Sequence, residues 1–461
     1  MDRRRFIQSA SLVAATAASI VAESPSGHQA LAQGSFLEGQ HDNLPATNEN
    51  VKEATARPMT RRWTEQRWVL DNVIQANGVD WDQPRTSYWN APCGMEASAD
   101  FAAIRQRVKK FADISTEFEA QARRREQRAH AAEQTRDVVT ARENYFVAAV
   151  HWGAAQWPIQ EANEQNRWYN RRKRECFTKY AKFADHPVTP VWIPIGAKSL
   201  PAWFHLPVGY SAGRIPAVVM IPGMDSFKEA SVALYGDPLL SRGFAVLALD
   251  GPGQYESPLL GVYMTMEGWE DVGKACIDWL QPQKEVDPER VAMTGRSFGS
   301  FGATIAVSNE PRYRAIAVSA TCFEPGFHTI FQEASPTFKM RFMFMANIAD
   351  EAAFDEFRNT LTWEGYADKI SIPYLCVAGQ ADELSPIGNT ERLFKTLRGP
   401  RQLVIYQESR HSVGGGVPSA ILGPSVSMLT SDWLAARFNG DSFTTEQWFV
   451  DSQGQITKTQ I

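Results

Sequence analysis

The chain has 461 residues, of which 44% are hydrophobic and 21% charged, a balance that excludes a disordered chain and allows a sizeable core. The formal net charge of −5 excludes the overall positive charge typical of proteins that bind nucleic acid or an anionic membrane. We therefore expect a small molecule as the partner, and no nucleic acid.

The cysteines lie far apart in the sequence, and no two have the spacing of metal ligands. Their number, five, is odd, which argues against a disulfide framework, although one bridge stays open in an oxidising compartment. They are Cys93, Cys176, Cys276, Cys322 and Cys376. We expect neither a metal nor a cofactor.

Residues 1–32 have the order of a secretory signal. The segment “DRRRFIQ” is basic, the alanine-rich segment after it is weakly apolar, and “ALA” at 30–32 matches a small-residue cleavage site. Paired arginines before “FI” resemble the twin-arginine type, which exports folded proteins; the alternative is a disordered basic tail. The apolar segment is too short for a membrane span, and no other segment reaches that length. We expect export to the periplasm without stable membrane insertion.

A helical region follows a polar segment, 33–60, that we interpret as a linker or arm. Between residues 61 and 186, prolines are few from Phe101 to Trp157 and no alternating runs occur, which predicts helices. Tyr145 and Trp152 recur at helical spacing in “RENYFVAAVHWGAAQW” and so share one face. We interpret the run “RRREQR” at 123–128 as a solvated helix face, with an anion site as the alternative.

Short apolar runs alternate with helical segments from residue 187 to 440. “VTPVWIPI” and “LPAWFHLP” predict a hairpin, and the later runs include “IPAVVMIPG”, “GFAVLALDGPG”, “VAMTGRSFG” and “IPYLCVAGQAD”. Unbroken apolar strands are buried on both faces, and their alternation with helices favours a mostly parallel sheet with right-handed crossovers. The predicted fold class is therefore α/β, and we expect residues 441–461 to be a C-terminal tail.

Ser297 stands between two glycines in “TGRSFGS”, after an apolar run and before a helix of small residues. Strand, tight turn and helix in this order are typical of a nucleophile elbow, in which Gly295 and Gly299 permit the turn and close packing. The serine oxygen is then exposed at the carboxyl end of the sheet, and the new helix offers N–H groups to an anion. The pattern predicts that Ser297 is a nucleophile.

A serine hydroxyl needs a base, and the base needs an acid to orient it. In this architecture the acid and the histidine follow the serine in the chain, each after a later strand. “VAGQADELSP” offers Asp382, with Glu383 as the alternative acid, and “VIYQESRHSVGGG” offers His411. We therefore predict a catalytic triad of Ser297, Asp382 and His411.

The oxyanion that forms when a carbonyl is attacked needs two preorganised N–H donors. We expect them from the backbone of Phe298, next to the nucleophile, and of Met224, in the loop “MIPGMDSFKE” after the third strand. “DGPGQYES” lacks the Gly-Lys-Ser/Thr ending of a phosphate loop, so we interpret it as a structural turn at the rim of the site.

The chain carries, in this order behind the helical region, “PGMDSFKE”, “LDGPGQYES”, “GRSFGS”, “GQADELSP” and “SRHS”. It thereby resembles the α/β-hydrolase group of dihydroxypseudooxynicotine hydrolase, the fungal polyketide-shortening hydrolases and the fermentation/respiration switch proteins. The resemblance implies an α/β-hydrolase fold, a helical cap domain at 61–186 over a catalytic domain at 187–440, the triad named above and a homodimer.

Members of the group similar to the first enzyme cleave a carbon–carbon bond beside an aryl ketone and use an additional buried carboxylate. By this resemblance Glu324, in “AVSATCFEPGFH”, is the matching candidate. The chain departs from the group at Tyr255, where a glycine is usual, and in its export signal.

The aromatic residues bear on the substrate. “FQEASPTFKMRFMFMANI” is interpreted as part of a lid over an apolar substrate or as core, and Tyr145, Trp152 and Tyr255 are candidate substrate-binding residues. The expected function is a serine hydrolase that, by resemblance, cleaves a carbon–carbon bond next to a carbonyl in an aromatic or polyketide-like ketone. The alternatives are a carboxylesterase or lactonase acting on a hydrophobic ester, and a non-catalytic regulatory binding module.

Overall fold

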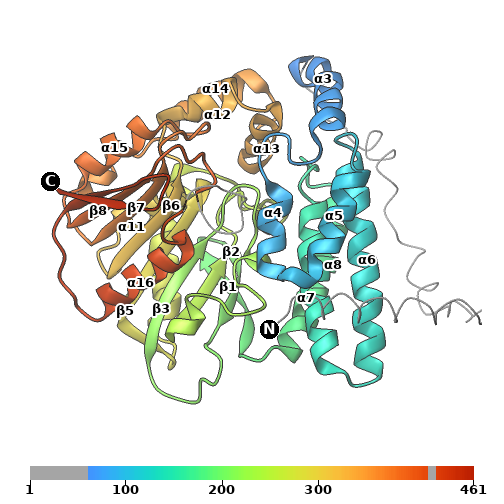
Figure 1. The fold of residues 1–461 in the computed structure, drawn as a ribbon, viewed down its shortest axis with the longest axis horizontal. Coiled ribbons are helices and arrows are strands. Elements are labelled where there is room, and N and C mark those ends of the chain that lie inside the picture. Colours follow the sequence, from blue (N-terminus) through green and yellow to red (C-terminus); the bar gives the residue numbers. More distant parts are fainter. Residues whose placement is uncertain (1–60, 414–421) are drawn as a thin grey trace, which may run out of the picture. The chain divides into compact units, whose positions relative to one another are not determined.

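The computed structural model describes residues 61–413 and 422–461, whose fold is drawn in Figure 1. The expected signal peptide, residues 1–32, and the expected arm, residues 33–60, lie outside the described residues. All described residues belong to one compact unit.

Helices make up the part of the chain from residue 61 to 183, which lies beside the sheet in Figure 1. Asp137 and Asn163 begin two of them, because each side chain accepts a hydrogen bond from a backbone N–H that the first helical turn leaves unpaired. The helices are α3 (Arg61–Asn77), α4 (Arg85–Asn90), α5 (Ser98–Arg107), α6 (Asp113–Gln134), α7 (Val138–Ala155) and α8 (Glu164–Phe183), with the short 3-10 helices η1 (Ala91–Cys93) and η2 (Met95–Ala97).

Helix α7 packs between α6 and α8 and is buried on nearly every side. The charged run at 123–128 lies on α6, and it is not the wholly solvated face that we expected. Arg125 is buried, and its Nε donates to Asp100 Oδ2 at 2.5 Å. Because a buried guanidinium needs a paired anion, this arginine holds α6 against α5.

One sheet contains the ten strands of the described residues, in the order β1-β2-β4-β3-β5-β6-β7-β8-β9-β10. Adjacent strands from β4 through β9 pair in parallel, and β1–β2, β2–β4 and β9–β10 pair antiparallel. The strands are β1 (Val188–Ile195), β2 (Lys198–His205), β3 (Ile215–Ile221), β4 (Ala245–Leu249), β5 (Val286–Ser297), β6 (Ala315–Thr321), β7 (Tyr374–Gly379), β8 (Arg401–Tyr406), β9 (Glu446–Val450) and β10 (Ile456–Gln460).

This mostly parallel sheet confirms the predicted α/β fold class. The segment 441–461 differs from the expected tail, because it supplies β9 and β10 and so extends the sheet beyond β8. Strand β9 has only five residues, most of them partly buried, and β10 is exposed along its whole length. Without a continuous apolar run, these two strands gave no clear signal in the sequence.

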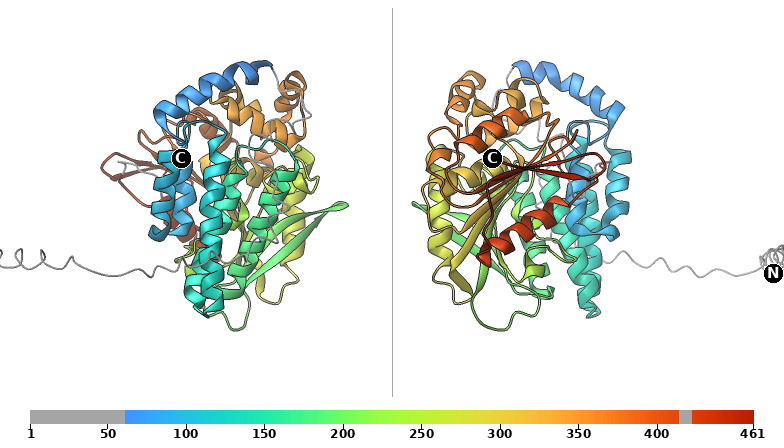
Figure 2. Two further views of the ribbon diagram at one scale, coloured as in Figure 1. Left: turned by 90° about the vertical axis from the view of Figure 1, so that its right-hand side faces the viewer. Right: turned by 60° about the vertical axis from the view of Figure 1, so that its left-hand side comes forward.

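Helices cover both faces of the sheet, because its central strands are apolar on both sides. Helix α16 packs on β6 and β7, across one face of the sheet in Figure 2. Helices α10 and α11 pack on each other, and the core around them continues into the helical region. The helices after β4 are α9 (Glu256–Leu259), α10 (Met266–Leu280), α11 (Phe298–Ser308), α12 (His328–Gln332), α13 (Pro336–Ala346), α14 (Glu351–Phe357), α15 (Ile387–Thr396) and α16 (Val426–Phe438).

The methionine- and phenylalanine-rich segment between β6 and β7 forms α12 and α13. It contacts the helical region: Trp81 Nε1 donates to Ser335 Oγ at 3.4 Å, and the hydroxyl of Thr337 donates to Asp82 at 3.3 Å. Most of its apolar side chains are buried, as the interpretation as core expected, while Phe338 lines the cavity described below. The segment therefore serves as core and also forms a wall of the site.

Candidate active site

Ser297 ends β5 and is followed directly by α11. Its backbone has φ 56° and ψ −129°, a left-handed conformation that is unfavourable for a residue with a side chain. The two flanking glycines permit this turn. A Cβ on Gly295 would lie 2.1 Å from the carbonyl oxygen of Gly299, and a Cβ on Gly299 would lie 2.3 Å from that of Ile221. No other residue type fits at either position without moving the backbone.

The loops after β7 and β8 bring an acid and a base to this serine. His411 Nε2 lies 2.8 Å from Ser297 Oγ, and His411 Nδ1 lies 2.9 Å from Asp382 Oδ2. Backbone N–H groups of Leu384 and Ser385 each donate to Asp382 Oδ1 at 2.9 Å, which fixes the carboxylate. Nucleophile, base and acid thus form one hydrogen-bonded chain in the predicted order.

The electrostatic surroundings of His411 suit a base held by an acid. Burial alone would lower the pKa of His411, but the charge and hydrogen bond of Asp382 raise it above its ordinary value. Glu383, the alternative acid, accepts from the backbone N–H of His411 at 2.9 Å and from Gln83 Nε2 at 2.8 Å. It therefore holds the loop in place, and its charge helps to raise the pKa of His411.

The two expected oxyanion donors belong to the loop after β3 and to the first turn of α11. Phe298 is the first residue of α11, and Met224 lies in the loop after β3 and lines the cavity with Ser297. Gln254, in the “DGPGQ” turn, ties this loop down, since its Nε2 donates to Pro222 O at 2.6 Å. Its Oε1 accepts from Gly251 N at 2.8 Å. The turn thus has the structural role that we expected at the rim of the site.

A buried ionic cluster supports the same loop. Lys228 Nζ lies 2.9 Å from Glu229 Oε1, 3.1 Å from Asp250 Oδ2 and 2.6 Å from Glu256 Oε2. Lys173, from α8, approaches Glu229 Oε2 at 3.3 Å, so the helical region takes part. Removing one partner would leave a buried charge uncompensated, and such changes are strongly destabilising. The cluster therefore binds α8 to the loops around Ser297.

A cavity of about 250 Å³ opens at Ser297 and His411. Gln83 and Tyr88 of the helical region and Phe338 of α13 are among the residues that line it. Its lining is more apolar than polar, and Asp225 and Arg296 are among its charged residues.

The sequence did not single out the ionic contacts of Asp225, which lines the cavity. Asp225 Oδ2 accepts from Arg85 Nε at 3.0 Å and from the Tyr88 hydroxyl at 2.5 Å. Arg85 is also paired with Asp82, whose pKa is raised because burial outweighs the attraction of Arg85. Asp225 belongs to the quoted “PGMDSFKE” motif, whereas Arg85 and Tyr88 lie in no recognisable motif.

Tyr145 and Trp152 do not line the cavity. The Tyr145 hydroxyl donates to Glu133 Oε2 at 2.7 Å, and Trp152 packs against Trp168 and Tyr169. The shared face of α7 contacts its neighbouring helices, so these two candidates are part of the helical core.

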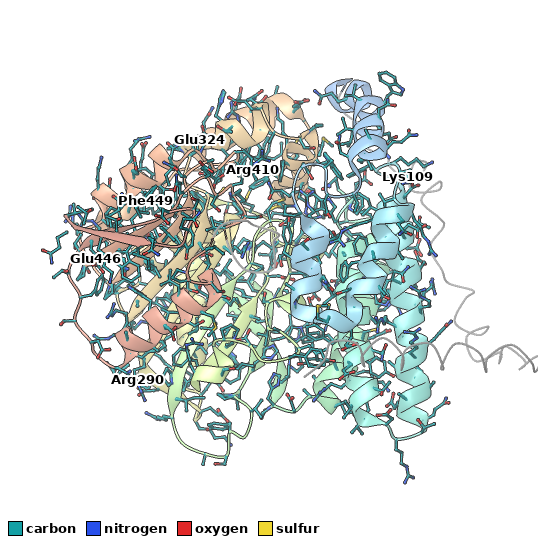
Figure 3. The ribbon with its side chains drawn as sticks, viewed as in Figure 1. Lys109, Arg290, Glu324, Arg410, Glu446 and Phe449 are labelled. Carbon is teal, nitrogen blue, oxygen red and sulfur yellow. The ribbon has the colours of Figure 1, made fainter. Side chains whose placement is uncertain are left out.

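Tyr255 and Glu324 also lie outside the lining of the cavity. Tyr255 is buried with φ 33°, which explains why a glycine is usual there, and its hydroxyl donates to the carbonyl of Asp225 at 3.2 Å. Glu324 accepts from the backbone N–H of Thr329 at 2.6 Å and from its hydroxyl at 3.1 Å. Figure 3 shows Glu324 among the helices that follow β6. The structure does not bring this carboxylate to Ser297.

The described residues contain no group of three or more His, Cys, Asp or Glu side chains able to hold a metal ion. The five cysteines are all buried with free thiols. Among the helices of residues 61–413 and 422–461, none is both long and apolar enough to cross a membrane.

Comparison with known proteins places this geometry in a family context. The model of the prolyl oligopeptidase family matches residues 237–434. Alpha/beta hydrolase xenA of Xenoacremonium sinensis is 30% identical over 186 residues, which are 38% of this chain and 44% of the relative. Alpha/beta hydrolase ucsC of an Acremonium species is 29% identical over 55% of this chain and 54% of its own.

A third relative, 2,6-dihydropseudooxynicotine hydrolase of Paenarthrobacter nicotinovorans, is 29% identical over 33% of this chain and 40% of its own. The chain thus spans about half the length of the curated relatives it matches. The crystal structure of 2,6-dihydroxy-pseudo-oxynicotine hydrolase has a TM-score of 0.64 and 21% identity, over 78% of this chain and 97% of that one. AbyA5 has a TM-score of 0.57 at 16% identity, over 83% and 95%. These two likenesses show the fold.

Proposed function

We propose that this chain, which has the α/β-hydrolase fold, is a serine hydrolase that cleaves a carbon–carbon bond next to a carbonyl group. The observation that carries the proposal is the hydrogen-bonded chain from Ser297 through His411 to Asp382, with its serine at a strained turn facing a cavity. An intact triad of this kind has no structural need in a protein that only binds a partner.

In the proposed reaction His411 takes the proton of Ser297 while the serine oxygen attacks the carbonyl carbon. The backbone N–H groups of Met224 and Phe298 stabilise the resulting oxyanion. The tetrahedral intermediate collapses to an acyl-enzyme, and His411 returns the proton to the departing fragment. Water, activated by the same histidine, then releases the acid.

The choice of a carbon–carbon bond is supported by the five quoted motifs and by the similarity to 2,6-dihydropseudooxynicotine hydrolase. We propose an aromatic or polyketide-like ketone as substrate, since the cavity is mainly apolar and has Phe338 in its lining. A carboxylesterase or lactonase would use the same triad and is the second candidate. A non-catalytic regulatory module is the third, and the intact hydrogen-bonded triad disfavours it.

The test compares an aryl β-diketone with an aryl ester of the same shape on purified protein. We expect turnover of the diketone to a carboxylic acid and a methyl ketone, with the activity lost in Ser297→Ala. Turnover of the ester alone would reassign the protein to the esterases. Turnover of neither, with no labelling of Ser297 by a fluorophosphonate, would support the binding module.

We further propose that residues 1–32 direct export to the periplasm by the twin-arginine route and that the mature protein is a homodimer without stable membrane insertion. The basic, apolar and small-residue segments of the sequence support the export proposal. The resemblance to the hydrolase group supports the dimer, which sedimentation of the purified protein would test.

A further inference from the structure

Two charged side chains besides His411 line the cavity at Ser297, namely Asp225 and Arg296, and the first of them is paired. Asp225 receives hydrogen bonds from Arg85 and from Tyr88, both on α4. Arg85 is almost fully buried and is also paired with Asp82. Both hydrogen bonds end on the same carboxylate oxygen, Asp225 Oδ2. The charge of Asp225 is therefore largely compensated without a ligand.

Arg296 is different, although it lines the same cavity and directly precedes the nucleophile. It is only partly exposed, and among the described residues it forms neither an ion pair nor a side-chain hydrogen bond. Burial lowers its pKa, and the nearby Tyr88 and Asp225 only partly offset this effect. A guanidinium offers five N–H donors in a planar fork suited to anionic oxygens. In Arg296 this capacity is unused.

Arg341, on α13, is a second arginine near Asp225, and it too has no ion pair among the described residues. Arg341 also lies close enough to Asp225 to be influenced by its charge, and its own polar contact is a long one, from Nη1 to Ile159 O at 3.4 Å. Arg85, Arg296 and Arg341 are all influenced by the charge of Asp225, but only Arg85 is hydrogen-bonded to it. An anionic oxygen that enters this cavity would give Arg296 the partner that it lacks among the described residues.

We propose that Arg296 binds an anionic oxygen of the substrate beside the scissile bond, namely the enolate oxygen that forms when a β-dicarbonyl compound is cleaved. This inference rests on the proposed function and makes the substrate class more specific. The oxygen concerned is not the one bound by Met224 and Phe298, because it belongs to the departing fragment.

The chemical step balances with water as the only co-reactant. The carbon–carbon bond breaks as the tetrahedral intermediate collapses, and its electron pair passes to the α-carbon and is delocalised onto the neighbouring carbonyl oxygen. Arg296 holds this enolate oxygen while His411 gives its proton to the α-carbon, which leaves as a methyl or methylene ketone. Water adds to the acyl group on Ser297 and leaves as part of the carboxylic acid. No oxidation or reduction takes place.

The same chemistry would arise if the substrate carried a carboxylate before the reaction. Three substrates separate the two sources: a neutral aryl β-diketone, a neutral p-nitrophenyl ester, and the same ester with a carboxylate on its acyl part. If Arg296 binds an enolate that forms during cleavage, its loss should lower kcat for the diketone. If it binds a carboxylate that the substrate already carries, its loss should raise KM for the charged ester.

The variants are Arg296→Met, which keeps the length and removes the charge, and Arg296→Lys, which keeps the charge. Arg290→Met is the matched control: Arg290 lies on the same strand, is paired with Asp287 and does not line the cavity. It is labelled at the lower left of Figure 3. Loss of one preorganised donor lowers kcat by about 10²–10³-fold, so we expect this loss for Arg296→Met on the diketone. The loss on the neutral ester should be much smaller, Arg296→Lys should recover part of the rate, and Arg290→Met should match the unchanged protein.

An increase in KM for the charged ester alone, tenfold or more, would support the anion site and assign it to a substrate carboxylate. Equal losses on all three substrates, or no loss on any, would overturn the proposal. Binding to the Ser297→Ala protein separates this inference from the proposed function, because it needs no turnover. Benzoate should bind more tightly than its neutral isostere benzamide, and Arg296→Met should abolish the difference. Equal binding of the two probes by the Ser297→Ala protein would overturn the anion site even if the diketone is cleaved.

Discussion

Replacing Gly299 by alanine tests how closely the turn after Ser297 packs on the end of β3. The added Cβ would lie 2.3 Å from the carbonyl oxygen of Ile221 and 2.4 Å from that of Pro222, distances that real Cβ atoms essentially never show. Both neighbours are backbone atoms, so they cannot turn aside as a flexible side chain would. The loop that carries Met224 must therefore shift away from Ser297.

We expect two measurable effects of this shift. Overpacking a tightly packed site costs about 1–3 kcal/mol, which urea unfolding would detect as a lower free energy of unfolding. Displacing one oxyanion donor lowers kcat by about 10²–10³-fold, and fluorophosphonate labelling of Ser297 should slow by a similar factor.

The control is Gly388→Ala on α15, where an added Cβ would meet no atom within 4 Å. Alanine is the better helix former by roughly 0.5–1 kcal/mol, so this variant should be as stable as the unchanged protein or slightly more stable, with normal labelling. If Gly299→Ala unfolded and reacted as the control does, the reasoning about the turn would be refuted.

Three further results are expected. Because the charge of Asp382 raises the pKa of His411 against the effect of burial, and the base must be neutral, kcat/KM should rise with pH through a value above that of an ordinary histidine. Asp382→Asn should move this rise to lower pH and reduce kcat by about 10⁴-fold, and an unmoved pH profile would contradict the pairing. Glu324→Gln should change the rates on diketone and ester by less than about threefold, whereas general acid–base catalysis would cost about 10²–10⁴-fold on the diketone alone. Replacing both Arg4 and Arg5 by lysine should leave precursor in the cytoplasm, which immunoblots of cell fractions would show. Unchanged export would exclude the twin-arginine route.

The residues that the sequence located best are those held by short local patterns. Ser297, Asp382 and His411 each follow an apolar strand, and parallel strands bring their carboxyl ends to the same edge of the sheet. The role of the glycines around Ser297 could be predicted equally well, because it is set by the backbone of a single turn. These local constraints were enough to predict the fold class and the order of the site.

The contact between Arg85 and Asp225 could not be predicted in the same way. Arg85 meets Asp225 across 140 positions of sequence, and no pattern on α4 marks this contact. Tyr145 and Trp152 show the opposite difficulty: aromatic residues at helical spacing fit a core as well as a pocket, and here α7 lies between two other helices. Which face of a helix meets the substrate depends on tertiary packing, which periodicity alone does not determine.

The central claim is that Ser297 attacks a ketone carbonyl and carries the acyl group away from a broken carbon–carbon bond. Rapid quenching of the protein with an aryl β-diketone, followed by mass spectrometry of the peptide that contains Ser297, tests this directly. We predict an aroyl adduct on Ser297 that appears before the acid product, and no adduct and no turnover in Ser297→Ala with its fold intact. Continued cleavage of the diketone by Ser297→Ala, or an adduct on another residue, would contradict the claim.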